Sequence, residues 1–297
     1  MISSAIWQLI ITQIEQVTHS SFIPSNRQEV SGGCINSAFI LQSKNQSYFV
    51  KLNQAHLLEM FKAEFDGLSE IAQTNTIKAP RPILTGVAAN QAFLVLEFID
   101  ISDKNSQSDT QLGHQLAALH KIQQSFFGWH TNNTIGSTPQ INDSSVHWLT
   151  FWQSHRLNFQ LSLAERNGYK GRLIQSGNKL SDSLHYFFNS YSPHPSLLHG
   201  DLWSGNAAMT TQGKAIIYDP ACYYGDRETD IAMTELFGGF SSHFYQAYNK
   251  AYPLDSGYST RKTLYNLYHI LNHLNLFGSS YQQQAQNMID SLLSEIS

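Results

Sequence analysis

The sequence contains very little cysteine, with only Cys34 and Cys222 in 297 residues. Two thiols that do not form a CxxC pair are no disulfide framework, so we expect a reducing, cytoplasmic compartment. Long hydrophobic runs are also lacking, because no stretch reaches the ~18 apolar residues of a membrane-spanning helix. The first residues carry no basic side chain before their apolar stretch, so we expect no signal peptide.

The chain also has no large excess of positive or negative charge. Charged residues make up 13 % of the chain, the formal net charge is −4, and Lys and Arg do not cluster. We therefore expect no nucleic-acid or membrane partner. The thirteen His residues are scattered without the spacing of metal ligands. The hydrophobic share of 41 % is ordinary for a chain that forms a packed core.

The hydrophobic periodicity changes along the chain. The first third contains strand-like runs between two helical patterns, and the remainder is mostly helical. We therefore predict an α+β, bilobal fold with a small β-rich N-lobe at 1–99 and a larger helical C-lobe at 100–297, joined near 99–103. The expected helices are 4–17, 57–72, 109–123 (capped by Ser108 or Asp109), 229–251, 260–277 and 281–296, and the expected strands are 38–42, 48–52, 92–99, 196–199 and 215–219.

The most informative stretch runs from Leu198 to Asn206. It has the form H-x-D, followed by four residues and an asparagine, and Asp219 ends an apolar run thirteen residues later. Phosphoryl transfer needs a carboxylate that accepts a hydrogen bond from the attacking hydroxyl. It also needs an amide oxygen and a second carboxylate to hold Mg²⁺ against the phosphates. We predict Asp201 as the catalytic carboxylate and Asn206 and Asp219 as magnesium ligands; a plain turn and a strand-end cap are the alternative interpretation.

Upstream residues supply the other parts of an ATP-dependent kinase. Such an enzyme needs a strand lysine for the phosphates, a helix glutamate that orients this lysine, and a flexible glycine loop. Lys51 lies in a predicted strand, Glu64 lies in the helix that follows, and Gly32 and Gly33 precede the hairpin. Each feature alone is common on protein surfaces, but together they occur in the required order. The sequence predicts a kinase that uses ATP and Mg²⁺, with Lys51 and Glu64 as catalytic residues and Gly32, Gly33 and Lys51 on the nucleotide.

Several blocks of the chain together resemble the fructosamine kinase (ketosamine-3-kinase) family. The resemblance runs from about Ser31 to Phe240, and its later blocks separate the chain from the related choline and aminoglycoside kinases. The blocks are Gly32-Gly33-Cys34-Ile35-Asn36, Phe49-Val50-Lys51, Phe127-Gly128-Trp129, Asn133 to Gln140, His199 to Asn206, Asp219-Pro220-Ala221, Tyr223 to Glu228 and Leu236 to Phe240.

This resemblance implies a protein-kinase-like fold and ATP-dependent phosphorylation of the 3-hydroxyl of a ketoamine, the Amadori product of a sugar and an amine. The 3-phosphate is unstable and falls apart, which frees the amine, so the family is associated with deglycation. Bacterial and plant-type members are associated with ribulosamines and erythrulosamines more than with fructosamines. The resemblance also implies that Glu97, Phe98 and Ile99 form the adenine-binding connection, and that the chain is a monomer. Whether the ketoamine is free or protein-bound stays open.

Two further residues have two interpretations each. Trp203 is either a platform beside the bound sugar or a core residue, and Asp226 either binds the substrate or joins a structural ion-pair cluster. Asp219 is followed by Pro220 in place of the Phe-Gly of protein kinases, and no Ala-Pro-Glu block follows. Both departures argue against a protein kinase with a phosphorylated activation loop.

The same residues leave other functions open. Cys34, in the glycine loop, could have a lowered pKa and form a redox-linked dimer, or be an inert small side chain. A kinase for an amino alcohol or an aminoglycoside would share Asp201, Asn206 and Asp219. A nucleotide-binding pseudokinase is the second alternative, although no catalytic part is lost. A hydrolase that uses His199 and Asp201 lacks a nucleophile elbow.

Overall fold

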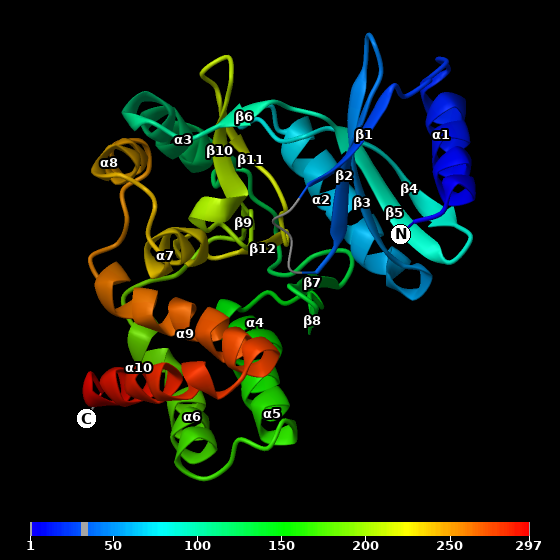
Figure 1. The fold of residues 1–297 in the computed structure, drawn as a ribbon. Helices are drawn as coiled ribbons and strands as arrows, with labels where there is room; N and C mark the ends of the chain where they lie inside the picture. The colour runs from blue at the N-terminus through cyan, green and yellow to red at the C-terminus, as the bar shows by residue number, and fades with distance from the viewer. Residues whose placement is uncertain (1, 31–34, 297) are drawn as a thin grey trace.

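A five-stranded antiparallel sheet forms the first part of the computed structural model, which describes residues 2–30 and 35–296 (Figure 1). The strand order is β1-β2-β3-β5-β4. Two helices pack against this sheet, one on each face. The elements of this part are α1 (Ser4–Thr18), β1 (Asn26–Val30), β2 (Ser37–Gln42), β3 (Ser47–Gln54), α2 (Leu58–Gln73), β4 (Pro82–Ala88) and β5 (Gln91–Glu97).

The interior strand β5 is buried on both faces. Phe93 and Val95 belong to the small core beneath α1, whereas Ala92, Leu94 and Leu96 belong to the main core on the α2 side. Successive side chains of a strand point to opposite faces, so a strand covered twice must be apolar throughout. The continuous apolar run that predicted this strand is therefore explained, and the prediction is confirmed within a few residues.

The same alternation places Lys51 on the α2 face of the sheet. Val50 and Leu52 lie in the core beneath α1, and Phe49, on the other face, packs against the main core. The hairpin predicted for β2 and β3 is confirmed, with Ser37 opposite Leu52. Strand parity thus directs the Lys51 side chain toward the helix that follows.

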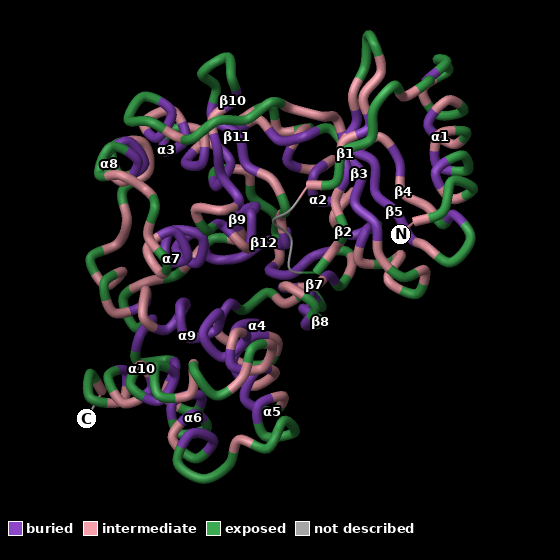
Figure 2. The backbone as a smooth tube through the Cα atoms, in the orientation of Figure 1, coloured by how far each residue is buried: buried purple, intermediate pink, exposed green. Residues whose placement is uncertain are grey.

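The second part of the structure is mostly helical. Figure 2 shows its burial, which is greatest along the helix at 228–236 and in the short strands at 196–198, 215–217 and 223–225. Its elements are β6 (Ile101–Ser102), α3 (Ser106–Leu119), β7 (Asn133–Ile135), β8 (Thr138–Gln140), α4 (Trp148–Trp152), α5 (Asn158–Arg166), α6 (Arg172–Asp182), β9 (Ser196–Leu198), β10 (Ala207–Thr210), β11 (Ala215–Ile217), β12 (Tyr223–Gly225), α7 (Glu228–Leu236), α8 (Ser242–Ala251), α9 (Tyr258–Phe277) and α10 (Gln282–Ser294).

The bounds predicted for the helix at 109–123 are wrong, because α3 begins at Ser106 and ends at Leu119. The N-cap is Asn105, whose side chain accepts from the backbone N–H of Ser108, while the Ser108 hydroxyl accepts from the N–H of Asn105. This reciprocal pair satisfies two N–H groups that the first turn leaves without partners. Asp109 is instead buried and accepts from the N–H of Ser241.

The single helix predicted at 229–251 is also wrong, because the structure has α7 and α8 there. Gly238 and Gly239 separate them, with φ angles of 71° and 90°. This left-handed region strains other residues but not glycine, so the pair ends the helix. A Cβ on Gly239 would lie 2.4 Å from Cβ of Ser204, so the break packs directly against the loop that follows Asp201.

A short connection leads from the sheet to the helical part. β5 ends at Glu97, and the next strand, β6, pairs with β10 of the helical part instead of extending the first sheet. Because the pairing partner changes between these strands, we propose that the two lobes meet in this connection, near the boundary expected at residues 99 and 100.

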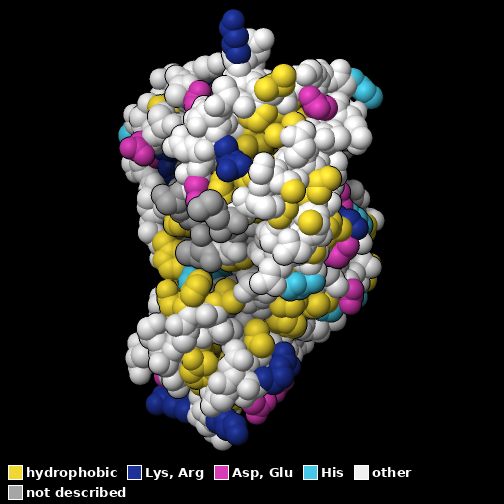
Figure 3. Space-filling view, turned by 45° about the vertical axis from the view of Figure 1, so that its right-hand side comes forward, with side chains coloured by type: hydrophobic (Ala, Val, Ile, Leu, Met, Phe, Trp, Pro, Cys, Tyr) yellow, Lys and Arg dark blue, Asp and Glu magenta, His cyan; other side chains and the backbone are white. Residues whose placement is uncertain are grey.

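The surface shows no large basic area in the view of Figure 3, where Lys and Arg side chains are scattered among acidic and neutral ones. The net charge of −4 agrees with this distribution. No helix among the described residues is long and apolar enough to cross a membrane.

Acid should destabilise the fold through His269, which lies in α9 and is 5 % exposed. Burial lowers the pKa of His269 to about 3, and the neighbouring His273 and Arg156 act in the same direction against Asp230. An unfolded histidine titrates near 6.5, so the unfolded chain takes up a proton that the fold excludes. This stability is present above about pH 6.5 and is lost as the pH falls toward 3. We expect His269 to lower the free energy of unfolding by about 1.5 kcal/mol between pH 6.5 and 5.

Urea unfolding at both pH values measures this loss. The His269→Gln variant should lose less stability on acidification than the wild type. The same change at exposed His243 controls for the removal of an imidazole elsewhere. If His269→Gln and the wild type lost the same free energy, the buried neutral imidazole would not be the cause.

Candidate active site

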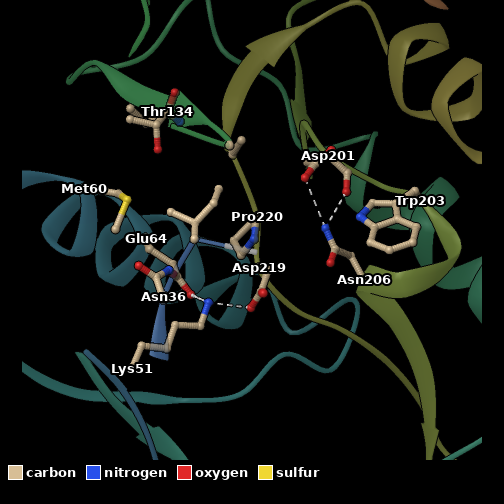
Figure 4. Close-up of a pocket in the computed structure, with 14 residues that line it drawn as sticks. Asn36, Lys51, Met60, Glu64, Thr134, Asp201, Trp203, Asn206, Asp219 and Pro220 are labelled. Carbon is tan, nitrogen blue, oxygen red and sulfur yellow. Dashed lines mark hydrogen bonds and ion pairs between the residues drawn. The ribbon is translucent and has the colours of Figure 1, made fainter. Parts of the chain in front are cut away.

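A pocket between the sheet and the helical part contains six of the ten predicted site residues that the structure describes (Figure 4). Lys51 and Glu64 enter it from the first part, and Asp201, Asn206 and Asp219 enter it from the second. The residues that line the pocket are Ile35, Asn36, Lys51, Met60, Glu64, Asn133, Thr134, Gly136, Asp201, Trp203, Asn206, Asp219, Pro220 and Ala221.

Lys51 forms two ion pairs, and the one with Asp219 joins the two parts of the structure. Its Nζ lies 2.6 Å from Oε1 of Glu64 and 2.7 Å from Oδ1 of Asp219. Burial lowers the pKa of Lys51, but the charges of Asp219 and Glu64 outweigh it, so the pKa lies above its ordinary value. The ammonium is therefore charged and held at one position in the pocket.

Helix α2 supplies two residues to the pocket, Met60 and Glu64. They are four positions apart, so they lie on the same face of the helix one turn from each other. Glu64 was predicted from its order after the strand lysine. Met60 was missed, although helical spacing from Glu64 could have indicated that it lines the same site.

The backbone at Gly200 shapes the loop that carries Asp201. Gly200 has a φ of 82°, and a Cβ there would lie 2.0 Å from the carbonyl oxygen of Ala221. The N–H of Ala221 donates to the carbonyl of His199 at 2.8 Å. Only glycine permits this close approach. It brings the loop after β9 next to the segment that follows Asp219.

The buried carboxylate of Asp230, which we did not predict, fixes the backbone of this loop through hydrogen bonds. Asp230 in α7 accepts from the backbone N–H groups of His199 at 2.7 Å and Gly200 at 2.9 Å, and its Oδ2 lies 3.1 Å from Nε2 of His120. Burial raises the pKa of Asp230, but its hydrogen-bond partners outweigh it and leave the pKa below its ordinary value. Its partners come from distant segments, so no sequence spacing signals this residue.

Asp201 and Asn206 are in direct contact. Nδ2 of Asn206 donates to the backbone carbonyl of Asp201 at 2.9 Å and to its Oδ2 at 3.3 Å. Burial raises the pKa of Asp201 to about 7, and the charges of Asp219 and Asp230 add to the effect. These contacts orient the carboxylate of Asp201 and turn the NH₂ group of the Asn206 amide toward it.

The donor set suits magnesium. Because Nδ2 of Asn206 faces Asp201, its amide oxygen points away from Asp201, as Figure 4 shows. The Asp219 side chain is 47 % exposed, so its carboxylate is accessible from the pocket. Magnesium prefers oxygen ligands and takes one or two from the protein, with the rest from water and phosphates. Residues 2–30 and 35–296 contain no group of three His, Cys, Asp or Glu side chains that would hold a metal alone.

Trp203 lies at the rim of the pocket and is 40 % exposed. A Cβ on Gly205 would lie 2.2 Å from the indole ring, so the ring rests directly on the backbone of that glycine. This exposure does not fit a core tryptophan. The geometry favours the interpretation of Trp203 as a platform beside a bound molecule.

Four predicted residues lie outside the pocket lining. Glu97, Phe98 and Ile99 are at and just after the end of β5, and the N–H of Glu97 donates to the carbonyl of Arg81 at 2.8 Å. Asp226 is fully buried. It accepts from the hydroxyls of Tyr191 and Tyr265 and from the N–H of Glu228. These three donors favour the structural interpretation of Asp226.

The predictions for Gly32, Gly33 and Cys34 fall outside the described residues. In the part of the chain that the structure describes, Cys222 is a buried free thiol. Burial raises its pKa well above the ordinary value, so it is not a reactive cysteine.

Comparison with known sequences gives matches along nearly the whole chain. The model of the family described as fructosamine kinase matches residues 6–295. A Synechocystis protein named probable ketoamine kinase is 49 % identical over 297 residues, covering 98 % of each chain. The chloroplastic protein-ribulosamine 3-kinase of Arabidopsis thaliana is 42 % identical over 267 residues, covering 89 % of this chain and 81 % of the relative.

Solved structures agree in fold. A crystal structure from Haemophilus somnus, assigned as a fructosamine-3-kinase, has a TM-score of 0.89 and 31 % identity, covering 97 % of this chain and 98 % of that chain. The choline kinase of Streptococcus pneumoniae has a TM-score of 0.68 at 15 % identity, with 98 % and 100 % covered. The similarity to the choline kinase shows the fold alone, which is protein-kinase-like and bilobal.

Proposed function

This chain belongs to the fructosamine kinase family, and from that premise we propose that it transfers phosphate from ATP to the 3-hydroxyl of a ketoamine. The observation that carries the proposal is the arrangement of Lys51. Its ammonium contacts a helix carboxylate and Asp219 in the same pocket that contains Asp201 and Asn206. These are the parts that phosphoryl transfer requires, gathered from two separate regions of the fold.

Asp201 is the proposed general base. Its carboxylate lies on the pocket wall, where it would accept a hydrogen bond from the 3-hydroxyl and then the proton as the oxygen attacks. The contact with Asn206 holds one carboxylate oxygen, so the other is available to the substrate. Positioning of the hydroxyl by a fixed carboxylate is a large part of catalysis in this reaction class.

Other residues of the pocket lining would bind the phosphates of ATP and magnesium. Lys51 would contact phosphate oxygens while Glu64 holds it in place. Asn206 and Asp219 would hold magnesium, whose charge offsets that of the phosphates during transfer. The adenine would lie near Glu97, Phe98 and Ile99, which are at and just after the end of β5, the strand that pairs with the Lys51 strand.

The acceptor side of the pocket would bind the ketoamine. Trp203 offers an exposed indole face at the rim, and Thr134 projects from the β7–β8 hairpin on the other side (Figure 4). Aromatic faces and hydroxyl groups are suited to a sugar, which has both C–H and O–H surfaces. Phosphorylation at the 3-position produces an unstable ester that decomposes and frees the amine, so the expected result is deglycation.

A substrate panel tests the proposal and ranks the sugars. We expect ADP release with ribulose- and erythrulose-derived ketoamines of lysine. The kcat/KM should be about tenfold lower for the fructose derivative, which has one carbon more than the ribulose derivative and two more than the erythrulose derivative. If none of the three ketoamines caused ADP release although ATP still bound, this result would contradict the proposal. Turnover of a simple amino alcohol in the same assay would then identify the alternative substrate class.

A further inference from the structure

Two sequence blocks of the family have no part in the proposed mechanism, Phe127–Trp129 and Tyr223–Glu228. The structure joins them. The N–H of Gly128 donates to the carbonyl of Tyr224 at 2.9 Å, and the N–H of Tyr224 donates to the carbonyl of Gly128 at 2.8 Å. This reciprocal bridge holds the backbones of the two blocks together at Gly128 and Tyr224.

The side chains of Trp129 and Tyr224 both donate to one carboxylate, that of Glu70 in α2. The indole Nε1 of Trp129 lies 2.6 Å from Oε2 of Glu70, and the hydroxyl of Tyr224 lies 2.6 Å from Oε1. Trp129 and Tyr224 are themselves buried. Short hydrogen bonds to an ionised acceptor are stronger than those between neutral groups. Glu70 is therefore held at both oxygens by the helical part of the protein, although α2 packs against the sheet.

A second contact fixes the same helix to the segment after Asp219. A Cβ on Gly67 would lie 3.0 Å from Sγ of Cys222 and 3.7 Å from Cγ of Pro220. Glycine at this position lets the helix approach the chain closely. The C-terminal half of α2 thus rests on residues that directly follow a carboxylate partner of Lys51.

We propose that Glu70 is a positioning residue for phosphoryl transfer, holding α2 against the helical part so that Glu64 stays in contact with Lys51. The proposal rests on the proposed kinase function. Glu64 and Glu70 are six positions apart on one helix, which is about 9 Å along its axis. A helix of this length moves as a rigid body, so releasing one end tilts the other. A small displacement of Glu64 would break its contact with Lys51 and reduce the fraction of enzyme that holds the ammonium correctly.

The Tyr224→Phe variant removes one of the two hydrogen bonds without changing the shape of the side chain. We expect kcat/KM for ATP to fall about tenfold and KM for the ketoamine to change less than twofold. Tyr258→Phe is a matched control, because the Tyr258 hydroxyl also donates to a glutamate, Glu235, but both residues belong to the helical part, Tyr258 to α9 and Glu235 to α7. We expect this control to leave kcat/KM for ATP within twofold of the wild type.

A double-variant cycle separates positioning from a merely structural role. If Glu70 acts through Glu64, Tyr224→Phe should have almost no further effect on kcat/KM for ATP in a Glu64→Gln background. A tenfold loss that persists in that background would overturn the proposal. So would a Tyr224→Phe enzyme that melts earlier than the wild type but keeps its kcat/KM for ATP.

Hydrogen exchange gives a readout that needs no substrate. Backbone amides of α2 should exchange at least several-fold faster in Tyr224→Phe than in the wild type, whereas those of β5 should not change. Unchanged exchange in α2 would contradict the proposal even if the enzyme phosphorylated no ketoamine. Faster exchange in α2 without any ketoamine turnover would instead retain the proposed contact and reject the proposed substrate.

Discussion

Replacing Asp201 by asparagine should lower kcat on a ketoamine by about a thousandfold, because general-base catalysis contributes roughly 10²–10⁴. Asparagine has the same shape as aspartate but cannot take the proton of the attacking hydroxyl. The contact with Asn206 and the backbone contacts of the loop would remain, so the pocket should keep its geometry. ADP release measures the rate, and calorimetric titration with Mg·ATP should give an affinity close to that of the wild type.

A second aspartate controls for the loss of a charge. Asp290 forms an ion pair with Arg172 on the surface, and Asp290→Asn should change kcat less than twofold. If Asp201→Asn kept more than a tenth of the wild-type kcat, Asp201 would not be the base. Loss of ATP affinity in Asp201→Asn would instead indicate that the variant disturbs the nucleotide side of the pocket.

Replacing Lys51 by methionine should reduce both activity and stability. We expect kcat/KM for ATP to fall by about 10²–10³, because a preorganised charge at the transferred phosphate is removed. The free energy of unfolding should fall by about 3 kcal/mol, because Glu64, with its side chain 11 % exposed, loses its ion-pair partner. Steady-state kinetics and urea unfolding measure the two effects separately.

The double variant Lys51→Met/Glu64→Gln separates the two causes. It no longer buries an unpaired carboxylate, so it should recover part of the lost stability while its activity stays low. A double variant no more stable than Lys51→Met would contradict the account of the ion pair. Activity of Lys51→Met within tenfold of the wild type would contradict the proposed role of Lys51.

The features of the fold that follow from local periodicity could be predicted. The β2–β3 hairpin, α2 and the apolar strand β5 are each defined by alternation or helical spacing within a few residues. β1 and β4 were missed for identifiable reasons. β1 is almost entirely exposed and polar, with no apolar alternation. β4 begins at Pro82, and a proline argues against a strand in a sequence pattern although it is tolerated at the start of an edge strand.

The candidate site could be predicted only as far as its residues follow a spacing. Lys51, Asp201 and Asn206 occur in short ordered patterns, and the structure brings them to one pocket. Asp230 and Glu70 have no such pattern, because their partners are backbone N–H groups and side-chain donors from segments far along the chain. Contacts of this kind are decided by tertiary packing, which local sequence does not encode.

The most direct test of the account is the position at which the phosphate is attached. ³¹P and ¹³C NMR of ribulose-derived lysine ketoamine with Mg·ATP and the enzyme would locate the new ester. The account predicts a phosphomonoester on carbon 3 that forms together with ADP. This ester then eliminates orthophosphate and is hydrolysed by water to free lysine and a 3-deoxy dicarbonyl sugar. A phosphate on another hydroxyl, or ADP formed at the same rate without the ketoamine, would contradict it.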